Sequence, residues 1–321
     1  MIAAVVVCLG ACLAFAAVAP LAGRRLPPAA ATRLLAGGSV LAAGCGGFVL
    51  AVMAAVWLGQ IGEVAEWGHW SPVALHADSP LPAPVGFAAG AVLLPLAFLG
   101  VRAVVDRCRQ LVRVHLACRR LARPGQVAIV DSAVPDAFTT PGVVGRIVVT
   151  TALLTALDPD QQRALIAHER SHMAHRHAWW RLAADLAAAV NPLLRRTADT
   201  VAQAIERWAD EDAAAVVGDR QLVARAVAHA ALASRRRPAS PVAAAVGGRV
   251  PQRVRALLAP PPRRRPLLLA GLLVVLLAGA GGAAAVEHTG EDLFEHAELH
   301  GQHAAPHGPA LARYRDGRRH R

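Results

Sequence analysis

Four uncharged apolar stretches constrain this chain more than any other feature of its sequence. They run from Ile2 to Gly23, from Leu34 to Gly59, from Leu81 to Val101 and from Pro266 to Val286. Each offers the roughly 20 apolar residues that a helix needs to cross the hydrocarbon core of a bilayer. Gly and Ala recur in all four, and small residues let helices pack closely in lipid. The sequence therefore predicts a mainly α-helical, multi-pass membrane protein in contact with the lipid bilayer.

The distribution of arginine predicts which connections face the cytoplasm, because short loops with excess Arg stay on that side. The loop after the first span is basic, with Arg24, Arg25 and Arg33. The loop over residues 60–80 has acidic residues and no Arg, whereas many arginines follow the third span. We therefore expect a cell-membrane protein with both termini outside. Residues 1–101 would be the membrane region with three helices, 102–265 a cytoplasmic domain, and 266–286 the fourth helix.

The last residues, 287–321, form a polar tail that is rich in histidine. Its histidines include His288, His296, His300, His303 and His307. The composition is typical of a disordered segment, although the spacing also suits metal binding outside the cell. The net charge of +12 does not by itself indicate nucleic acid, because basic clusters beside membrane spans more often reflect topology. No direct nucleic-acid partner is expected.

Residues 102–265 are numerous enough to bury a core of their own. Two short strands are predicted, at Gln126–Val130 and Arg146–Thr150, with Pro141 and Gly142 in the turn region between them. With the helices that follow, they predict an α+β domain.

Two helices of this domain carry recognisable end signals. The first begins near Asp158, which can cap it, with Pro159 at the first helical position and Gln161 completing a capping-box pattern. The second runs from about Thr200 to Val217 and ends at Gly218, a residue that tolerates the left-handed conformation.

The segment from Trp179 to Leu194 is apolar, but Arg181 and Asp185 interrupt it and Pro192 ends it. These residues favour a helix packed in the core or lying at the membrane interface. A fifth membrane crossing is the alternative, and it would move everything after it to the other side.

The sequence His168-Glu169-Arg170-Ser171-His172 is an HExxH pattern inside the first predicted helix. Residues four apart lie on one helix face, so both imidazoles can share one Zn²⁺ ion. Glu169 lies beside them and can act as general base on water at the metal. Chance occurrence is the alternative, and the capped helix start argues against it.

A catalytic zinc needs a third protein ligand. Glu206 and Asp210 lie four residues apart on the second helix and therefore face the same way. Glu206 can complete a His₂Glu ligand set, and Asp210 can hold a ligand histidine by its other ring nitrogen. The alternative is a solvated acidic face, which Glu211 and Asp212 would join.

HExxH followed by ExxAD, in a chain with flanking membrane spans, resembles the gluzincin membrane peptidases. These include the prenyl-protein endopeptidases, the heat-shock membrane peptidases and the BlaR/MecR-type antirepressor peptidases. The stretches 136–142 and 145–150 are similar to the turn and edge strand that precede the zinc helix in this group. Three spans before the domain and one after it are most similar to the BlaR/MecR arrangement. The resemblance implies a zincin-like protease domain with one Zn²⁺ per chain.

The resemblance also implies two further roles. An extended substrate is expected to pair with the edge strand formed by Arg146, Ile147, Val148, Val149 and Thr150. His177 lies where the heat-shock relatives often have a histidine, and it either supports a ligand or belongs to a polar helix end.

Three functions are compatible with these residues. The first is a zinc endopeptidase that cleaves a cytoplasmic protein in regulated proteolysis; the BlaR/MecR resemblance implies a winged-helix transcriptional repressor. The second is membrane-protein quality control by the same site. The third is a non-catalytic receptor or scaffold, and an intact Glu169 argues against it.

Overall fold

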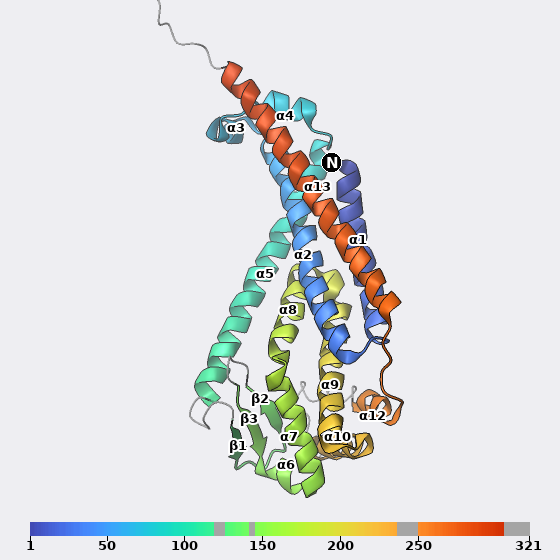
Figure 1. Ribbon diagram of the computed structural model, residues 1–321. Helices are drawn as coiled ribbons and strands as arrows, with labels where there is room; N and C mark the ends of the chain where they lie inside the picture. Colours follow the sequence, from blue (N-terminus) through green and yellow to red (C-terminus); the bar gives the residue numbers. More distant parts are fainter. Residues whose placement is uncertain (119–125, 141–144, 236–249, 305–321) are drawn as a thin grey trace, which may run out of the picture. The chain divides into compact units, whose positions relative to one another are not determined.

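Each apolar stretch forms a long helix in the structure, a computed structural model that describes residues 1–118, 126–140, 145–235 and 250–304 (Figure 1). These helices are α1 (Ile2–Gly23), α2 (Pro28–Leu58), α5 (Ala83–Cys118) and α13 (Pro266–Ala304). Within the described residues, they are the four helices that are long and apolar enough to cross a membrane. The predicted spans are confirmed at this level, although α2 begins earlier and α5 and α13 continue further than expected.

The described residues group into two compact units. The first unit comprises Met1–Cys8, Gly46–Leu94 and the chain from Gly281 onward, and the second comprises Leu9–Cys45 and Pro95–Ala280. The long helices therefore contribute residues to both units.

In the first unit, the short helices α3 (Gly62–Gly68) and α4 (Pro72–Asp78) follow α2, and the end of α13 packs against α2 and α4. The core shared by α2, α4 and α13 is Val56, Leu75, Leu293 and Ala297. The Ser71 N–H, at the start of α4, donates to the carbonyl of Ala297 (2.9 Å). The prediction of a disordered tail is therefore wrong for residues 287–304, because apolar side chains among the polar ones bury against α4. Residues 305–321 lie outside the described part of the chain.

In the second unit, the described residues form one small mixed sheet. Its strands are β1 (Val127–Val130), β2 (Ala137–Thr139) and β3 (Ile147–Thr150), in the order β1-β3-β2. β1 runs parallel to β3, and β2 runs antiparallel to it. The strands expected at 126–130 and 146–150 are present, whereas β2 was not predicted as a strand because three residues show no clear alternation.

The prediction that Arg146–Thr150 forms an edge strand is wrong. β3 is the central strand, its two edges pair with β1 and β2, and all four of its residues are buried. Ile147 and Val149 pack with Leu153 and Leu157 in a hydrophobic cluster. A β-branched strand that is buried on both faces suits the centre of a sheet.

The helices of the second unit follow the sheet in order. They are α6 (Thr151–Thr155), α7 (Pro159–Ala174), α8 (His177–Val190), the 3₁₀ turn η1 (Pro192–Leu194), α9 (Arg195–Val217), α10 (Arg220–Arg235) and α12 (Val250–Leu258). Helices α7 and α9 pack side by side, and β2 and β3 lie against α7 (Figure 1). Alanines of α7 and α9, including Ala164, Ala167 and Ala213, form the contact and allow a close approach.

The residues predicted to begin α7 and to end α9 lie at those helix ends in the structure. Asp158 caps α7 by accepting a hydrogen bond from the Gln161 N–H (2.8 Å). The capping box is only half formed, because the Gln161 side chain lies 3.0 Å from the ring of His229. Helix α9 begins earlier than predicted and ends at Gly218, which has φ of 76°.

Helix α8 and η1 account for the apolar segment from 179 to 194, which is not among the candidate membrane spans. Ala184, Ala187 and Ala188 are buried, and α8 packs against α9. Asp185 pairs with Arg181 and with Arg107 of α5 (3.1 Å). The segment is therefore a packed helix of the second unit.

Candidate metal centre

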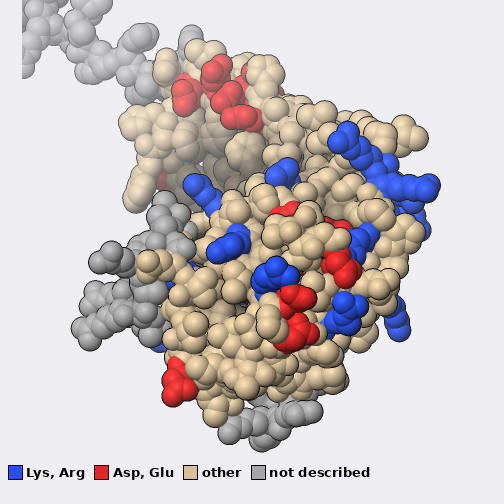
Figure 2. All heavy atoms as spheres, turned by 60° about the horizontal axis from the view of Figure 1, so that its bottom comes forward, with Lys and Arg blue, Asp and Glu red and all other residues tan. Residues whose placement is uncertain are grey.

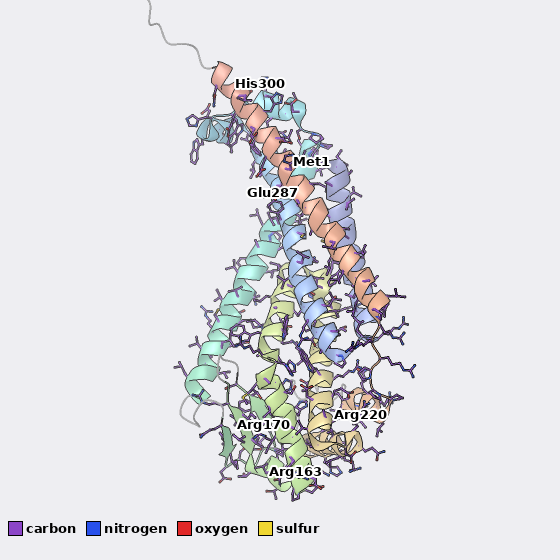
Figure 3. The ribbon with its side chains drawn as sticks, in the orientation of Figure 1. Met1, Arg163, Arg170, Arg220, Glu287 and His300 are labelled. Carbon is purple, nitrogen blue, oxygen red and sulfur yellow. The ribbon has the colours of Figure 1, made fainter. Side chains whose placement is uncertain are left out.

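Helix α7 presents the two predicted histidine ligands on its inner face. His168 Nε2 and His172 Nε2 lie 3.1 Å apart. Arg163 and Arg170 are exposed on the same helix, and Figure 3 labels both. The helical spacing thus separates an exposed basic face from a buried face that carries the imidazoles.

Helix α9 brings Glu206 to the same point. Its two carboxylate oxygens lie 3.8 Å from the Nε2 atoms of His168 and His172 respectively. These three residues are a group whose possible ligand atoms all lie within 4.8 Å of one another. Tetrahedral zinc ligands at roughly 2.0–2.1 Å from the metal stand about 3.3 Å from each other. The observed separations lie on either side of that value, so the residues fit Zn²⁺.

Asp210 lies one turn beyond Glu206 and contacts the far side of a ligand. Its Oδ1 atom is 3.0 Å from His168 Nδ1, although the ring N–H is not aligned with the carboxylate. Burial alone would raise the pKa of Asp210, but Arg253 and His168 together hold it well below its usual range. The pKa of His168 is raised, because burial lowers it less than Asp210 raises it. Asp210 is thus a permanently charged neighbour of a ligand imidazole.

Arg253 on α12 is a site residue that the sequence did not indicate. Its Nε and Nη2 atoms donate to the two oxygens of Asp210 (2.8 and 2.6 Å), and Nη1 lies 3.0 Å from Glu206 Oε2. These contacts outweigh the effect of burial and raise the pKa of the guanidinium. One arginine therefore contacts both Glu206 and Asp210 of α9. No local pattern marks it, since 43 residues separate it from Asp210.

Glu169 is buried beside the ligand pair. Thr139 Oγ1, at the end of β2, donates a hydrogen bond to Glu169 Oε2 (2.7 Å). Burial raises the pKa of Glu169, and His168 and Thr139 oppose that rise only in part. A carboxylate with a raised pKa suits a general base that works near neutral pH. Thr139 lies in the stretch that carries the family resemblance, but its contact with Glu169 was not predicted.

His177 meets the second ligand from the start of α8. Arg176, between α7 and α8, has φ of 52°, and this left-handed residue turns the chain sharply. His177 Nδ1 consequently lies 2.9 Å from His172 Nδ1. Burial, and then the neighbouring histidines, lower the pKa of His177 to about 3, so its ring is neutral. Of the two roles left open for His177, the contact favours support of a ligand.

His175 belongs to a neighbouring network rather than to the metal centre. Its Nε2 atom lies 2.9 Å from Asp212 Oδ2, which also accepts a hydrogen bond from Ser171 (2.7 Å). Its ring stacks on Trp208, with centroids 4.3 Å apart.

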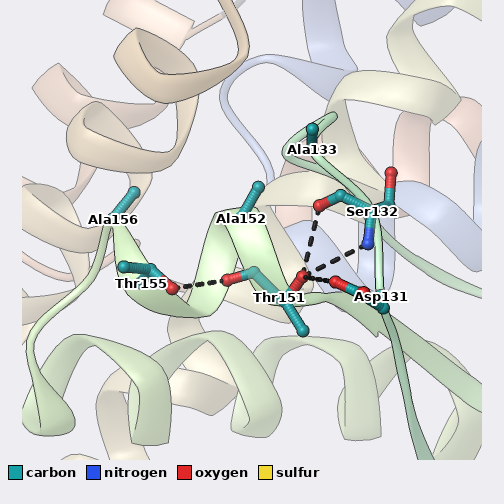
Figure 4. Close-up of a pocket in the computed structure, with 7 residues that line it drawn as sticks. All are labelled: Asp131, Ser132, Ala133, Thr151, Ala152, Thr155 and Ala156. Carbon is teal, nitrogen blue, oxygen red and sulfur yellow. Dashed lines mark hydrogen bonds between the residues drawn. The ribbon is translucent and has the colours of Figure 1, made fainter.

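A separate cavity of about 450 Å³ lies where β1 and β3 end (Figure 4). It is lined by Asp131, Ser132, Ala133, Thr151, Ala152, Thr155 and Ala156. Its polar groups bond to one another; for example, Thr151 Oγ1 donates to Asp131 (3.0 Å). None of the residues of the metal centre lines it.

Two histidines and a glutamate converge in an α+β domain, beside a buried carboxylate, in a chain with four apolar helices. This arrangement supports a membrane-type zinc metallopeptidase. Residues 106–257 match Peptidase family M48, which supports the same class. No curated protein and no solved structure matches the chain.

Proposed function

We propose that this protein is a membrane-embedded, zinc-dependent endopeptidase that hydrolyses peptide bonds of a cytoplasmic protein. The observation that carries the proposal is the convergence of His168, His172 and Glu206 beside the buried Glu169. A structural zinc site has no use for a general base, whereas a hydrolase requires one.

A zinc ion held by these ligands supplies Lewis acidity and lowers the pKa of water toward about 7. Glu169 accepts the proton of the attacking water and delivers it to the leaving amine. Thr139 fixes the Glu169 carboxylate through one oxygen and leaves the other free for this transfer. Asp210 and His177 orient the rings of His168 and His172 from behind.

We expect the substrate to pair with β2 instead of β3. β1 and β2 are the edge strands among the described residues, and only β2 touches Glu169, through its last residue. Backbone hydrogen bonds along β2 would align an extended peptide with the general base. Exposed Phe138 is the side chain of β2 best placed to contact such a peptide.

The charges of the two units support a cytoplasmic location for the metal centre. The charged residues of the described part of the first unit are all acidic: Glu63, Glu66, Asp78, Glu287, Glu291, Asp292, Glu295 and Glu298. The second unit carries the described arginines, and on the face in Figure 2 many of them lie among carboxylates. The positive-inside rule then favours a cytoplasmic side for the part of the second unit that holds the metal centre.

A reporter fusion tests this topology. Alkaline phosphatase, which is active only after export, should be active when fused after Ala304 and inactive when fused after Cys118. Cytoplasmic green fluorescent protein should give the opposite pattern at the two positions. An active phosphatase after Cys118 would contradict the assignment.

The identity of the substrate has two candidates. The BlaR/MecR resemblance favours a soluble transcriptional repressor of the winged-helix type. The second candidate, membrane-protein quality control, is favoured by the surroundings of Glu206. Arg207 donates to the carbonyl of Arg24 (3.4 Å), and Arg33 stands over the ring of Trp208. Arg24 lies in the turn between α1 and α2, and Arg33 lies near the start of α2. These contacts support a metal centre near the membrane surface.

Replacing His172 with alanine tests the catalytic proposal. We expect zinc content to fall from one ion per chain to nearly none, and hydrolysis of an extended peptide to be lost with it, because two ligands rarely retain zinc. His229→Ala is the control, since His229 contacts Gln161 outside the metal centre. Full zinc occupancy in His172→Ala would refute the ligand assignment.

The same assay separates the two substrate candidates. The wild-type protein, reconstituted in vesicles, is given one peptide either free or attached to a lipid anchor. Faster cleavage of the anchored peptide supports the membrane-protein candidate, and equal rates favour a soluble substrate.

A further inference from the structure

Helix α9 touches the turn between α1 and α2 at residues close to Glu206. Gly23 packs so tightly that a Cβ atom there would lie 2.9 Å from Thr200 Cγ2. Farther along α9, the guanidinium carbon of Arg33 stands 4.7 Å from the ring centre of Trp208. Trp208 is buried and lies two residues after the ligand Glu206. A cation over the face of a tryptophan ring is attracted by its electrons, so α2 is attached to the helix that carries a metal ligand.

Trp208 also contacts histidines beside the metal centre. Its ring centre lies 4.3 Å from His175, in a stacked arrangement, and 4.8 Å from His177. His177 in turn lies against His172, with ring centres 4.9 Å apart. Arg33, Trp208, His177 and His172 therefore form one continuous series of contacts from a membrane helix to a metal ligand.

The hydrogen bonding of His177 explains why this series of contacts can affect the metal ligand. When His172 uses Nε2 for the metal, its Nδ1 carries the proton and donates to Nδ1 of the neutral His177. The other nitrogen, His177 Nε2, is buried and has no hydrogen-bond partner among the described residues. One hydrogen bond leaves the imidazole free to rotate about it. The orientation of the His177 ring therefore depends on packing, chiefly on Trp208.

We propose that Arg33 and Trp208 are positioning residues through which α2 sets the orientation of His172. The proposal rests on the proposed function, because it assigns a regulatory input to the same metal centre. A shift of the N-terminal part of α2 would move Trp208, tilt His177 and weaken the hold on His172. The membrane helix would thereby tune metal affinity and turnover without touching the substrate.

The test compares Arg33→Gln, Arg33→Lys and the control Arg25→Gln in the full-length protein. Arg25 is an exposed residue of the turn just before α2, so its replacement removes the same charge without touching Trp208. Cobalt alone, bound in place of zinc, reports ligand geometry by its visible spectrum. We expect Arg33→Gln to change this spectrum and to lower kcat by about two- to fivefold, with KM unchanged. Arg33→Lys, which keeps the cation, should restore most of both readouts.

A double-mutant comparison adds a second check. In a Trp208→Leu background, Arg33→Gln should have no further effect on the cobalt spectrum, because the two residues act in series. An unchanged spectrum in Arg33→Gln, or an equal change in Arg25→Gln, would overturn the proposal. The spectrum needs no turnover, so failure of the coupling is distinguishable from failure of the peptidase assignment.

Discussion

Glu169→Gln should lower kcat for peptide hydrolysis by about 10²- to 10⁴-fold, the usual contribution of a general base. Glutamine has nearly the same shape, and its carbonyl oxygen can accept the hydrogen bond from Thr139. It cannot take up a proton at neutral pH. Zinc content should remain at the wild-type level, because Glu169 is not one of the three ligand residues. Metal analysis and steady-state kinetics on the same preparation measure both quantities.

The matched control is Asp160→Asn. Asp160 is an exposed carboxylate in the first turn of the same helix, where it pairs with exposed Arg163. Exposed pairs contribute little to stability, so this variant should retain wild-type kinetics. Undiminished proteolysis by Glu169→Gln would remove this residue from the mechanism.

Arg253→Met should be the most destabilising single replacement at the site. It leaves the carboxylates of Glu206 and Asp210 without the guanidinium that contacts both, and Asp210 is only 1% exposed. Removing one partner of a buried ion pair costs about 3–5 kcal/mol, because the remaining charge stays buried. We expect lower unfolding free energy in denaturant titrations and weaker zinc binding. Arg253→Lys should recover only part of the loss, since lysine cannot reproduce the two-pronged contact with Asp210.

The destabilisation should depend on pH in a defined direction. Because Arg253 depresses the pKa of Asp210, the wild type retains this stabilisation above the unfolded-state pKa of about 3.9. The wild type loses the contribution as pH falls through the lower folded-state pKa. In the variant, burial raises that pKa, which penalises the charged form at neutral pH. The stability difference should therefore widen as pH rises above about 4 and narrow below it.

Arg255→Met is the control for these measurements, because Arg255 is exposed on the same helix. It should unfold at nearly the wild-type denaturant concentration. If Arg253→Met also unfolded at the wild-type denaturant concentration, the contact between Arg253 and Asp210 would not contribute to stability.

The parts of the site that were predictable are those encoded within one helix. His168 and His172 share a face because of helical spacing, and Glu206 and Asp210 share one for the same reason. The convergence of the two helices was inferred from chemistry, since a catalytic zinc needs a third ligand. The structure brings these residues together with separations that fit a zinc ion.

The parts that were missed depend on contacts between distant segments. Thr139 and Arg253 reach Glu169 and Asp210 across 30 and 43 residues, and no local pattern records such a pairing. The central position of β3 was missed for the same reason, because the residues of a strand do not indicate which strands lie beside it. The helical extension of α13 was missed because its polar composition concealed Leu293 and Ala297, which bury against α4.

The brevity of β2 has a consequence for how such an enzyme would choose its targets. A strand of only three residues offers an incoming chain very few backbone hydrogen bonds, so it cannot pull a segment out of a folded neighbour. Substrate proteins would need a segment that is already locally unfolded, and the free energy of that local unfolding would govern the rate at which each is cleaved. Selectivity would then depend more on the local stability of the substrate protein than on the sequence around its cleavage site.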